Sequence, residues 1–361
     1  MFHGKKFQTF EMFKTLAISA VLCSGYDYHV DTLGEHPWQL HHSPSSFTVT
    51  RSANAHFGGM TSVSTGANEP NEDRITGFRA EVRDLNGDLV HDIDVMGVFD
   101  GHGGYFVSEY VSTKFPEVFS DFLGRTTNVT QALLSTFQTL ESSVRDLLLH
   151  DRFVQATLGD RRFNIGACGL VVVVTKDGII SANVGDSRAL AVTNDLHYFR
   201  LNREHNSGRP DEQAALRKRF PRDKDILQCF SEHVCYVKGM LQPTRSFGDL
   251  SLKERIPGLT FTQMRSYTPP YISAVPEILS FSKENVKYIV LGSDGVWEQI
   301  SDDNMGKVLD WANGDANGVK DVALQHAWNH AHITEDEYRH LPGQDRRQIV
   351  DDLSVVVLEM K

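Results

Sequence analysis

The residues best suited to chemistry are an aspartate and a histidine that follow an apolar run. Residues 95–99 have strand character, and Asp100, a glycine, His102 and two more glycines follow at once. A carboxylate at a strand end is held rigidly, and it can act as a metal ligand or base beside a proton-donating histidine. Glycines let the backbone approach a ligand closely. Taken alone, the stretch also fits a tight turn closed by the aspartate.

Acidic residues recur beside other apolar, strand-like runs. They share a place directly before or after such a run: Glu72-Asp73, Asp100, Asp186, Asp294 and Asp351-Asp352. Unpaired carboxylates that met at strand ends would repel one another strongly. Convergence therefore requires cations, and ligands that are all oxygen favour hard ions such as Mg²⁺ or Mn²⁺. The alternative is that each acid caps a strand in a separate turn, which suits one such position better than five.

The order of these segments resembles that of the PPM (PP2C) family of metal-dependent serine/threonine protein phosphatases. The matching segments lie between residues 68 and 358: 71–73, 98–104, 182–188, 244–249, 293–298 and 351–354. Each segment is a weak signal, whereas the ordered set is specific. The resemblance implies an α+β fold, the αββα sandwich of two packed antiparallel sheets flanked by helices. It also implies hydrolysis of phosphoserine and phosphothreonine in a phosphorylated protein substrate.

The resemblance further implies a role for each position. It gives the ligands of two Mg²⁺ or Mn²⁺ ions and a weaker third: Asp100 bridging, Asp294 and Asp351 on the first, Glu72 and the Gly101 carbonyl on the second, and Asp186 with Asp294 on the third. Asp73 would hold metal-bound water. A hydroxide bridging the metals would attack phosphorus, and His102 would protonate the leaving oxygen as general acid. Alternatively, His102 is hydrogen-bonded to a nearby carboxylate and has no catalytic role.

One position departs from the family pattern. Most relatives carry an arginine five residues before Asp73, where it binds the substrate phosphate, and here that position is Asn68. An amide cannot replace the charge of a guanidinium. However, residues 68–74, 204–206, 241–249 and 268–277 are similar to the pyruvate dehydrogenase phosphatase branch of the family. This similarity makes Asn68 a feature of the lineage more than a sign of lost activity.

Three other positions receive secondary roles. Asp249 lies in a segment that we interpret as mainly structural. Asp352 stands where many relatives have asparagine, and it either supports Asp351 or is a surface acid. Cys168 replaces a usual threonine and is interpreted as a packing residue.

Three functions fit these observations. The first is an active metal-dependent protein phosphatase. The alternative, motivated by Asn68, is an inactive pseudophosphatase that serves as a binding or regulatory protein. The third is a metal-dependent hydrolase of small phosphate esters.

Composition narrows the classes of partner. The 361 residues carry 47 acids against 36 bases, a net charge of −11, which makes nucleic acid a poor partner. Four scattered cysteines are interpreted as free thiols in a reducing compartment, with a disulfide as the alternative. No apolar run reaches the ~18 residues of a membrane span. We expect an intracellular protein, cytoplasmic or mitochondrial.

Two regions follow from the patterns along the chain. Residues 1–55 form a lead-in segment, whose apolar stretch 16–23 suits either a packed helix or a targeting segment. Residues 56–361 form the phosphatase-like domain, with a flap at about 203–240. Within the domain we expect a hairpin over 75–99 with a type I′ turn at Asn86-Gly87. The other expected elements are strands over 170–192, 286–291 and 353–360, and helices over 106–115, 129–149, 212–219, 301–312 and 318–331.

Overall fold

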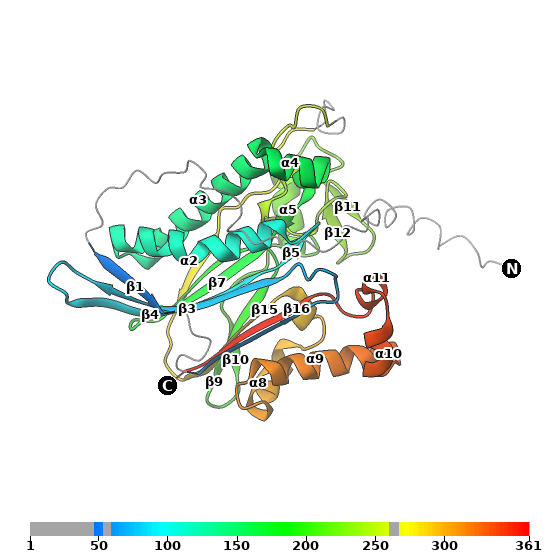
Figure 1. Ribbon diagram of the computed structural model, residues 1–361. Helices are drawn as coiled ribbons and strands as arrows, with labels where there is room; N and C mark the ends of the chain where they lie inside the picture. Colours follow the sequence, from blue (N-terminus) through cyan, green and yellow to red (C-terminus); the bar gives the residue numbers. More distant parts are fainter. Residues whose placement is uncertain (1–46, 53–58, 260–266, 361) are drawn as a thin grey trace. The chain divides into compact units, whose positions relative to one another are not determined.

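Two antiparallel sheets form the centre of the computed structural model, which describes residues 47–52, 59–259 and 267–360 (Figure 1). The 6-stranded sheet has the order β1(Thr48–Ser52), β3(Arg74–Arg83), β4(Leu89–Phe99), β7(Gly169–Val174), β8(Ile179–Val184), β14(Glu277–Phe281). The 5-stranded sheet has the order β10(Tyr198–Arg200), β9(Arg188–Thr193), β15(Val286–Gly292), β16(Leu353–Glu359), β2(Met60–Thr65). The predicted αββα sandwich is confirmed.

Helices cover the outer faces of both sheets (Figure 1). The first sheet carries α2(Phe106–Thr126) and α3(Val129–His150), and the second carries α8(Asp302–Trp311) and α9(Ala316–Ala331). These match the helices expected from the apolar spacing, although α2 runs eleven residues beyond the predicted end at 115. The helices α4(Arg152–Leu158), α10(Glu335–His340) and α11(Gly343–Arg346) were not predicted. In the described parts of the chain, no helix has the length and apolar character to cross a membrane.

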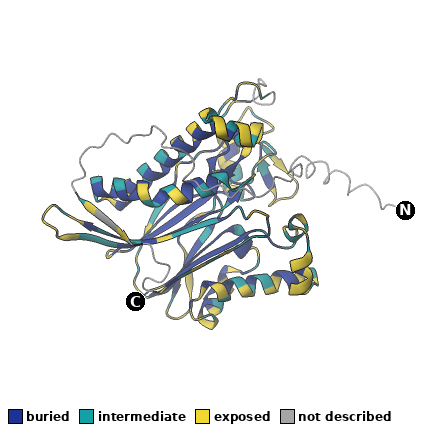
Figure 2. Ribbon diagram, in the orientation of Figure 1, coloured by how far each residue is buried: buried dark blue, intermediate teal, exposed yellow. Residues whose placement is uncertain are grey.

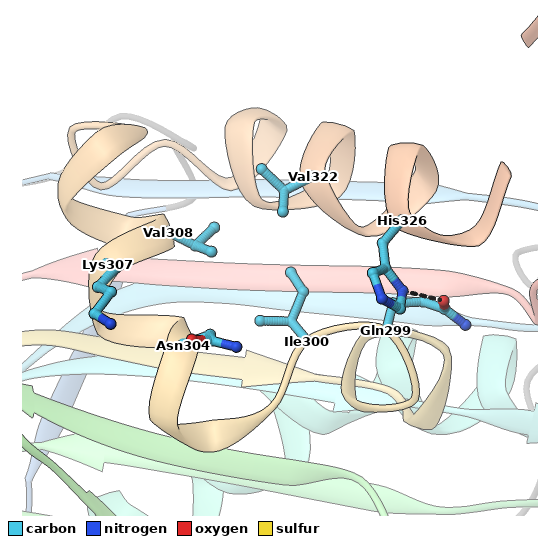
Figure 3. A pocket seen from close by; sticks show the side chains of 7 residues that line it. All are labelled: Gln299, Ile300, Asn304, Lys307, Val308, Val322 and His326. Carbon is cyan, nitrogen blue, oxygen red and sulfur yellow. Dashed lines mark hydrogen bonds between the residues drawn. The ribbon is translucent and has the colours of Figure 1, made fainter. Parts of the chain in front are cut away.

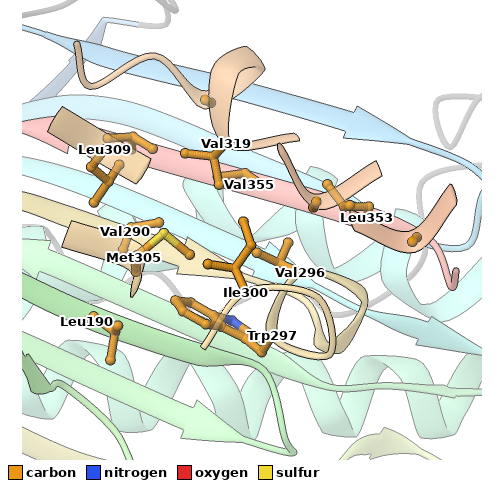
Figure 4. Close-up of a cluster of buried hydrophobic side chains, with 14 of the residues drawn as sticks. Leu190, Val290, Val296, Trp297, Ile300, Met305, Leu309, Val319, Leu353 and Val355 are labelled. Carbon is orange, nitrogen blue, oxygen red and sulfur yellow. The ribbon is translucent and has the colours of Figure 1, made fainter. Parts of the chain in front are cut away.

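The central strands are buried on both faces, which explains their unbroken apolar sequences. Along β16, Val355 and Val357 face the helices α8 and α9, whereas Val356 and Leu358 face the first sheet. Figure 4 shows the helix-side cluster, which includes Leu353 and Val355 of β16 together with Met305, Leu309 and Val319. Figure 2 shows the buried residues concentrated in the strands and on the inner sides of the helices. The strand ends are therefore rigid supports for side chains.

The hairpin over β3 and β4 forms as expected, but its turn differs from the prediction. Gly87 has a φ of 89°, whereas Asn86 is not among the residues with positive φ. A type I′ turn needs positive φ at both central positions. Instead Asp84 and Asp88 close a longer loop, because the amide of Asp84 donates to the carbonyl of Asp88 at 2.9 Å. The Asp84 carboxylate also accepts from the amide of Asn86 at 2.9 Å, which favours this loop.

The expected strands over 170–192 are present, and they divide between the two sheets. β7 and β8 belong to the first sheet, and β9 belongs to the second. The crossing at 185–187 begins with Gly185, whose φ is 110°. A Cβ on Gly185 would lie 2.3 Å from Sγ of Cys168, so the crossing needs a glycine. This crossing holds Asp186 at the end of β8.

The cysteine prediction is wrong for one pair. Cys229 and Cys235 form a disulfide, with Cα atoms 4.0 Å apart. They face each other across the hairpin of β11(Leu227–Cys229) and β12(Cys235–Val237), where antiparallel pairing brings side chains close. Their spacing in sequence did not reveal this hairpin. The disulfide removes the cysteine argument for a reducing compartment, while Cys168 is a buried free thiol, as predicted, and Cys23 lies outside the described residues.

The predicted flap has its own small core. The helix α5(Pro210–Arg219) appears two residues before its predicted start, and Leu216 packs with Val237 and Tyr271 in a separate apolar cluster. β1 lies inside the predicted lead-in segment, yet it pairs with β3 along five residues. All described residues belong to one unit, Leu40–Lys361. The predicted helix or targeting segment at 16–23 lies outside the described residues.

Candidate active site

Strand pairing brings the predicted acids to one end of each sheet. Asp100 follows β4 and Asp73 precedes β3, and these two strands are antiparallel neighbours. Asp294 follows β15 and Asp351 precedes β16, which are antiparallel neighbours in the second sheet. The two pairs lie near each other, since the charges of Asp73, Asp294 and Asp351 all act on Asp100. The convergence predicted from the sequence is therefore present.

Asp73, Asp100, Asp294 and Asp351 are called the acidic cluster below. Burial and mutual repulsion act on two of them, Asp100 and Asp294. Burial raises the pKa of Asp100 well above its usual range, and the charges of Asp294 and Asp73 raise it further. Burial likewise raises the pKa of Asp294, and the charges of Asp186 and Asp351 add to the effect. Carboxylates in such a site are stable as anions only when positive charge is close.

Glu72 and Asp73 share this environment on the neighbouring loop. Burial raises the pKa of each to about 7, and for Glu72 the nearby charge of Arg347 opposes the effect of burial. Oε2 of Glu72 and Oδ2 of Asp73 are buried without a hydrogen-bond partner. Such oxygens are costly to bury, and they mark places where an ion or water completes the structure.

The acidic cluster fits a divalent cation without being closed around one. Among the described residues, no three acidic, histidine or cysteine side chains lie in a finished metal-binding arrangement. The donors are nevertheless all oxygens, they are buried or partly buried, and two of them lack partners. A Cβ on Gly101 would lie 2.4 Å from the Glu72 carbonyl oxygen, so the two backbones are in direct contact. This donor set suits Mg²⁺ or Mn²⁺ better than a softer metal.

His102 is paired with a carboxylate from a distant segment. Its Nε2 lies 2.8 Å from Oδ2 of Asp249, which also accepts a hydrogen bond from Ser246 at 2.6 Å. A small sheet of β5(Gly101–His102), β6(Gly166–Ala167) and β13(Phe247–Gly248) brings the two residues together. A Cβ on Gly166 would lie 2.1 Å from the Asp249 oxygen and 2.5 Å from His102 Nε2. The glycine therefore makes room for the pair.

The contact changes the protonation of His102. Burial lowers the pKa of His102, but the charge and hydrogen bond of Asp249 raise it above its ordinary value. A histidine that stays protonated near neutral pH is suited to donate a proton. We predicted that Asp249 is mainly structural, and the structure adds that its carboxylate contacts the predicted general acid. The same contact is the one expected by the alternative in which His102 is hydrogen-bonded to a carboxylate and has no catalytic role.

Asp186 is held beside the cluster by two hydrogen bonds. Asn206 donates to its Oδ2 at 2.6 Å, and the thiol of Cys168 donates to its Oδ1 at 3.1 Å. The charge of Asp186 acts on both Asp100 and Asp294. Cys168, interpreted as a packing residue, is buried and also orients Asp186. Burial raises the pKa of this thiol well above its usual range, so it remains a hydrogen-bond donor.

Asp352 is a buried acid, and the alternative of a surface acid is wrong. Its two oxygens accept four hydrogen bonds from the loop that carries Glu72. The donors are the amides of Ala67 at 2.7 Å, Asn68 at 2.8 Å and Glu72 at 2.7 Å, and the side-chain amide of Asn68 at 2.9 Å. Asn68 was predicted to lie at the substrate phosphate, but its side-chain amide donates a hydrogen bond to Asp352. This contact connects the loop to the start of β16.

A match to a protein-family model identifies the family of this chain. The model described as protein phosphatase 2C matches residues 60–313, which include most of both sheets and the acids from Glu72 to Asp294. The chain belongs to the protein phosphatase 2C family. It is accordingly a serine/threonine phosphatase of the PP2C type, in a family that depends on Mg²⁺ or Mn²⁺.

Individual relatives agree with this assignment. The chain is 28% identical over 277 residues to "Probable protein phosphatase 2C 64" of Arabidopsis thaliana, covering 73% of this chain and 68% of the relative. It is 27% identical over 280 residues to "Probable protein phosphatase 2C 78" of Oryza sativa subsp. japonica, covering 73% and 69%. The similarity to the pyruvate dehydrogenase phosphatase branch stays a prediction.

Solved structures share the fold. A serine-threonine phosphatase 2C from Toxoplasma gondii superimposes with a TM-score of 0.57 at 16% identity, covering 87% of this chain and 99% of that chain. A C. elegans sex determining protein gives a TM-score of 0.58 at 18% identity, covering 82% and 64%. At such identities the likeness concerns the fold alone.

Two cavities of this phosphatase 2C chain differ in chemistry. One of about 370 Å³ is bordered by Asp186, Asp294 and Arg209, and so connects the acidic cluster with the flap. The other, of about 310 Å³, lies between α8 and α9 (Figure 3). Figure 3 shows it lined by the apolar side chains of Ile300, Val308 and Val322 and by four polar ones, Gln299, Asn304, Lys307 and His326. His326 is bonded to Gln299 at 3.2 Å. The second cavity has no carboxylate and is not part of the candidate site.

One residue at the site was missed by sequence reasoning. Arg347 follows α11, and its guanidinium lies 3.4 Å from Asp351 and 3.9 Å from Glu72. The available signal was a basic pair, Arg346-Arg347, four and five residues before Asp351. Nothing in that spacing separates a site residue from an ordinary surface arginine.

Proposed function

We propose that the chain removes phosphate from phosphoserine and phosphothreonine in protein substrates, using two Mg²⁺ or Mn²⁺ ions in the acidic cluster. The observation that carries this proposal is the convergence of Asp73, Asp100, Asp294 and Asp351 from four strand ends, with raised pKa values for the first three. Such acids are poor anions by themselves and good ligands for hard cations.

Each acid has a place in the proposed ligand set. Asp100 would contact both ions, with Asp294 and Asp351 on the first and Glu72 and the Gly101 carbonyl on the second. Asp73, buried beside Glu72, would act from outside this set, and Asp186 with Asp294 would hold a weaker third ion. When bound, such ions lower the pKa of water and supply hydroxide near neutral pH.

His102 supplies the proton that the leaving group needs. As oxygen from water adds to phosphorus, the bond between phosphorus and the serine or threonine oxygen breaks, and the proton of His102 passes to that oxygen. Asp249 orients the imidazole through the 2.8 Å contact and stabilises its protonated form. No covalent intermediate with the protein is required.

The cavity between cluster and flap is where the polypeptide around the phosphorylated residue would bind. It combines Arg188 and Arg209 with Glu204, and Asn206 and Gln242 add hydrogen-bonding groups. A mixed polar lining of this kind suits a peptide backbone and side chains better than an apolar ligand. This favours a protein substrate over a small phosphate ester.

Turnover of a phosphopeptide with Mn²⁺ tests the proposal. We expect hydrolysis that chelator abolishes, and a loss of at least about 100-fold in kcat for Asp294→Asn. The matched control is Asp310→Asn, an exposed acid on α8 paired with Lys287, which should leave kcat unchanged. Hydrolysis that persists with chelator or in Asp294→Asn would exclude the metal mechanism. Absence of Mn²⁺ binding by calorimetry in folded protein would instead support the inactive pseudophosphatase.

A further inference from the structure

We propose that Arg347 is the residue that binds the phosphate group of the substrate in this chain. The inference rests on the proposed function, and it identifies the positively charged side chain that binds the doubly charged phosphate ester. It concerns the residue after α11, a segment that neither the motifs nor the metal ligands include.

Arg347 lies at the open side of the acidic cluster. Its Nη1 is 3.4 Å from Oδ1 of Asn68 and 3.9 Å from Oε2 of Glu72, and its Nε is 3.4 Å from Oδ1 of Asp351. Its side chain is 46% exposed, whereas Glu72 and Asp351 are 15% and 30% exposed. The guanidinium thus borders both the proposed ligands and solvent.

The contacts of Arg347 are long compared with those of a committed ion pair. All three are at or beyond 3.4 Å, and Oε2 of Glu72 remains without a hydrogen-bond partner. Arg188 offers the contrast, because it is 16% exposed and bonds Glu204 at 2.7 Å while also contacting Asp302. A charge-assisted hydrogen bond is about 2.7–2.9 Å long. Arg347 therefore lies near Glu72 and Asp351 without forming a short ion pair with either.

Metal binding would release Arg347 from its present neighbours. Glu72 and Asp351 are proposed ligands, and a divalent ion on each removes the net negative charge that now attracts the guanidinium. The N–H groups of Arg347 would then be available to a phosphate group held beside Glu72 and Asp351. A guanidinium can hold two phosphate oxygens through parallel hydrogen bonds, which fixes the orientation of the ester.

Asn68 is poorly placed for this task. Its side-chain amide donates to Asp352 at 2.9 Å, and its carbonyl oxygen faces Arg347. A carbonyl oxygen repels phosphate oxygens, but it can steady a guanidinium. Asn68 thus acts as a support for Arg347, and the positive charge comes from a part of the chain 279 residues away.

The experiment compares Arg347→Ala and Arg347→Lys with the intact chain, using inorganic phosphate as a competitive inhibitor of phosphopeptide hydrolysis. We expect the inhibition constant for phosphate and the KM to rise about 10- to 100-fold in Arg347→Ala. In Arg347→Lys both constants should lie between those of the intact chain and those of Arg347→Ala, because lysine keeps the charge and loses the paired hydrogen bonds. Affinity for Mn²⁺, measured by calorimetry, should not weaken.

Arg346→Ala is the matched control. Arg346 carries the same charge one residue away, but its guanidinium pairs with Glu69 and its side chain is 15% exposed. This variant should leave the phosphate constant within about twofold of the intact chain. Similar losses in both variants would overturn the proposal, since a general charge effect would then explain them.

Two outcomes separate this inference from the proposed function. An intact chain that hydrolyses the phosphopeptide, with an unchanged phosphate constant in Arg347→Ala, would reject Arg347 and leave the phosphatase activity standing. A loss confined to Mn²⁺ affinity would also reject it. If the intact chain has no activity, calorimetry with phosphate and Mn²⁺ still tests Arg347, because binding does not require turnover.

Discussion

Nε2 of His102 lies 2.8 Å from Oδ2 of Asp249, although the two residues are 147 positions apart in the chain. Asp249 is 3% exposed, and its backbone adopts a left-handed conformation with φ of 49°. The contact raises the pKa of His102 against the effect of burial. The pair therefore relates the proposed proton donor to a segment with no proposed metal ligand.

Asp249→Asn should shift the pH dependence of kcat. The substitution removes the charge that raises the pKa of His102, so that pKa falls and the imidazole loses its proton at lower pH. The loss of activity on the basic side should then move to lower pH. A pH profile of kcat with a phosphopeptide and saturating Mn²⁺ measures this.

Two further variants serve as comparisons for Asp249→Asn. Ser246→Ala removes one hydrogen bond to the carboxylate but keeps its charge, so the basic limb should move less than in Asp249→Asn. Gly166→Ala places a methyl group against both His102 and Asp249 and so disturbs their contact, and it should move the basic limb in the same direction as Asp249→Asn does. An unmoved basic limb in Asp249→Asn would show that His102 is not the proton donor.

Asp352→Asn should destabilise the fold near the site. The carboxylate accepts four N–H bonds, whereas an asparagine turns two acceptor positions into a donor group that faces other donors. We expect a loss of about 1–3 kcal/mol in the free energy of unfolding. Urea denaturation measures it.

Asp336→Asn is the control for that measurement. Asp336 lies on α10 with 88% of its side chain exposed, so its replacement should change stability by less than about 0.5 kcal/mol. If Asp352→Asn is equally mild, the four hydrogen bonds do not anchor the loop of Glu72.

The metal-free protein should lose stability as pH rises. Burial raises the pKa of Glu72 and Asp73 to about 7, so the folded state keeps protons that the unfolded chain has already released. The free energy of unfolding then falls between about pH 4 and about pH 7, by an amount on the order of a few kcal/mol. Thermal unfolding in chelator at several pH values measures the trend.

Mn²⁺ and one variant provide the controls for this trend. Mn²⁺ should raise the melting temperature most at the upper end of the pH range, because ligands bind it as anions. Asp100→Asn removes an acid that the metal-free fold can hold only at a cost, either as an unpaired anion or with a retained proton. The variant should therefore be more stable than the intact chain at neutral pH without metal, and it should respond less to Mn²⁺. Stability that rises with pH in chelator would contradict the proposed state of the acids.

Several parts of the fold were within reach of sequence reasoning. The helix α3 follows from apolar residues at helical spacing, and β15 and β16 follow from apolar runs that no helix pattern explains. The hairpin of β3 and β4 follows from a turn signal between two strands, but its turn type did not, because the Asp84 side chain closes the loop. Local patterns thus predicted elements better than their ends and turns.

The sequence by itself determined the strands, the acids at their ends and the family to which the chain belongs. These depend on residues near one another in the chain, and on an order of motifs that needs no coordinates. Only the tertiary structure decided that Asp249 meets His102, that Asp352 holds the Glu72 loop, that Cys229 bonds Cys235, and that Arg347 faces the acidic cluster. The physical reason is that each of these contacts depends on strand register or on loop closure, and most join residues more than 100 positions apart. The residue type determines the chemistry of a side chain, but the packing of the whole domain determines which partner that side chain contacts.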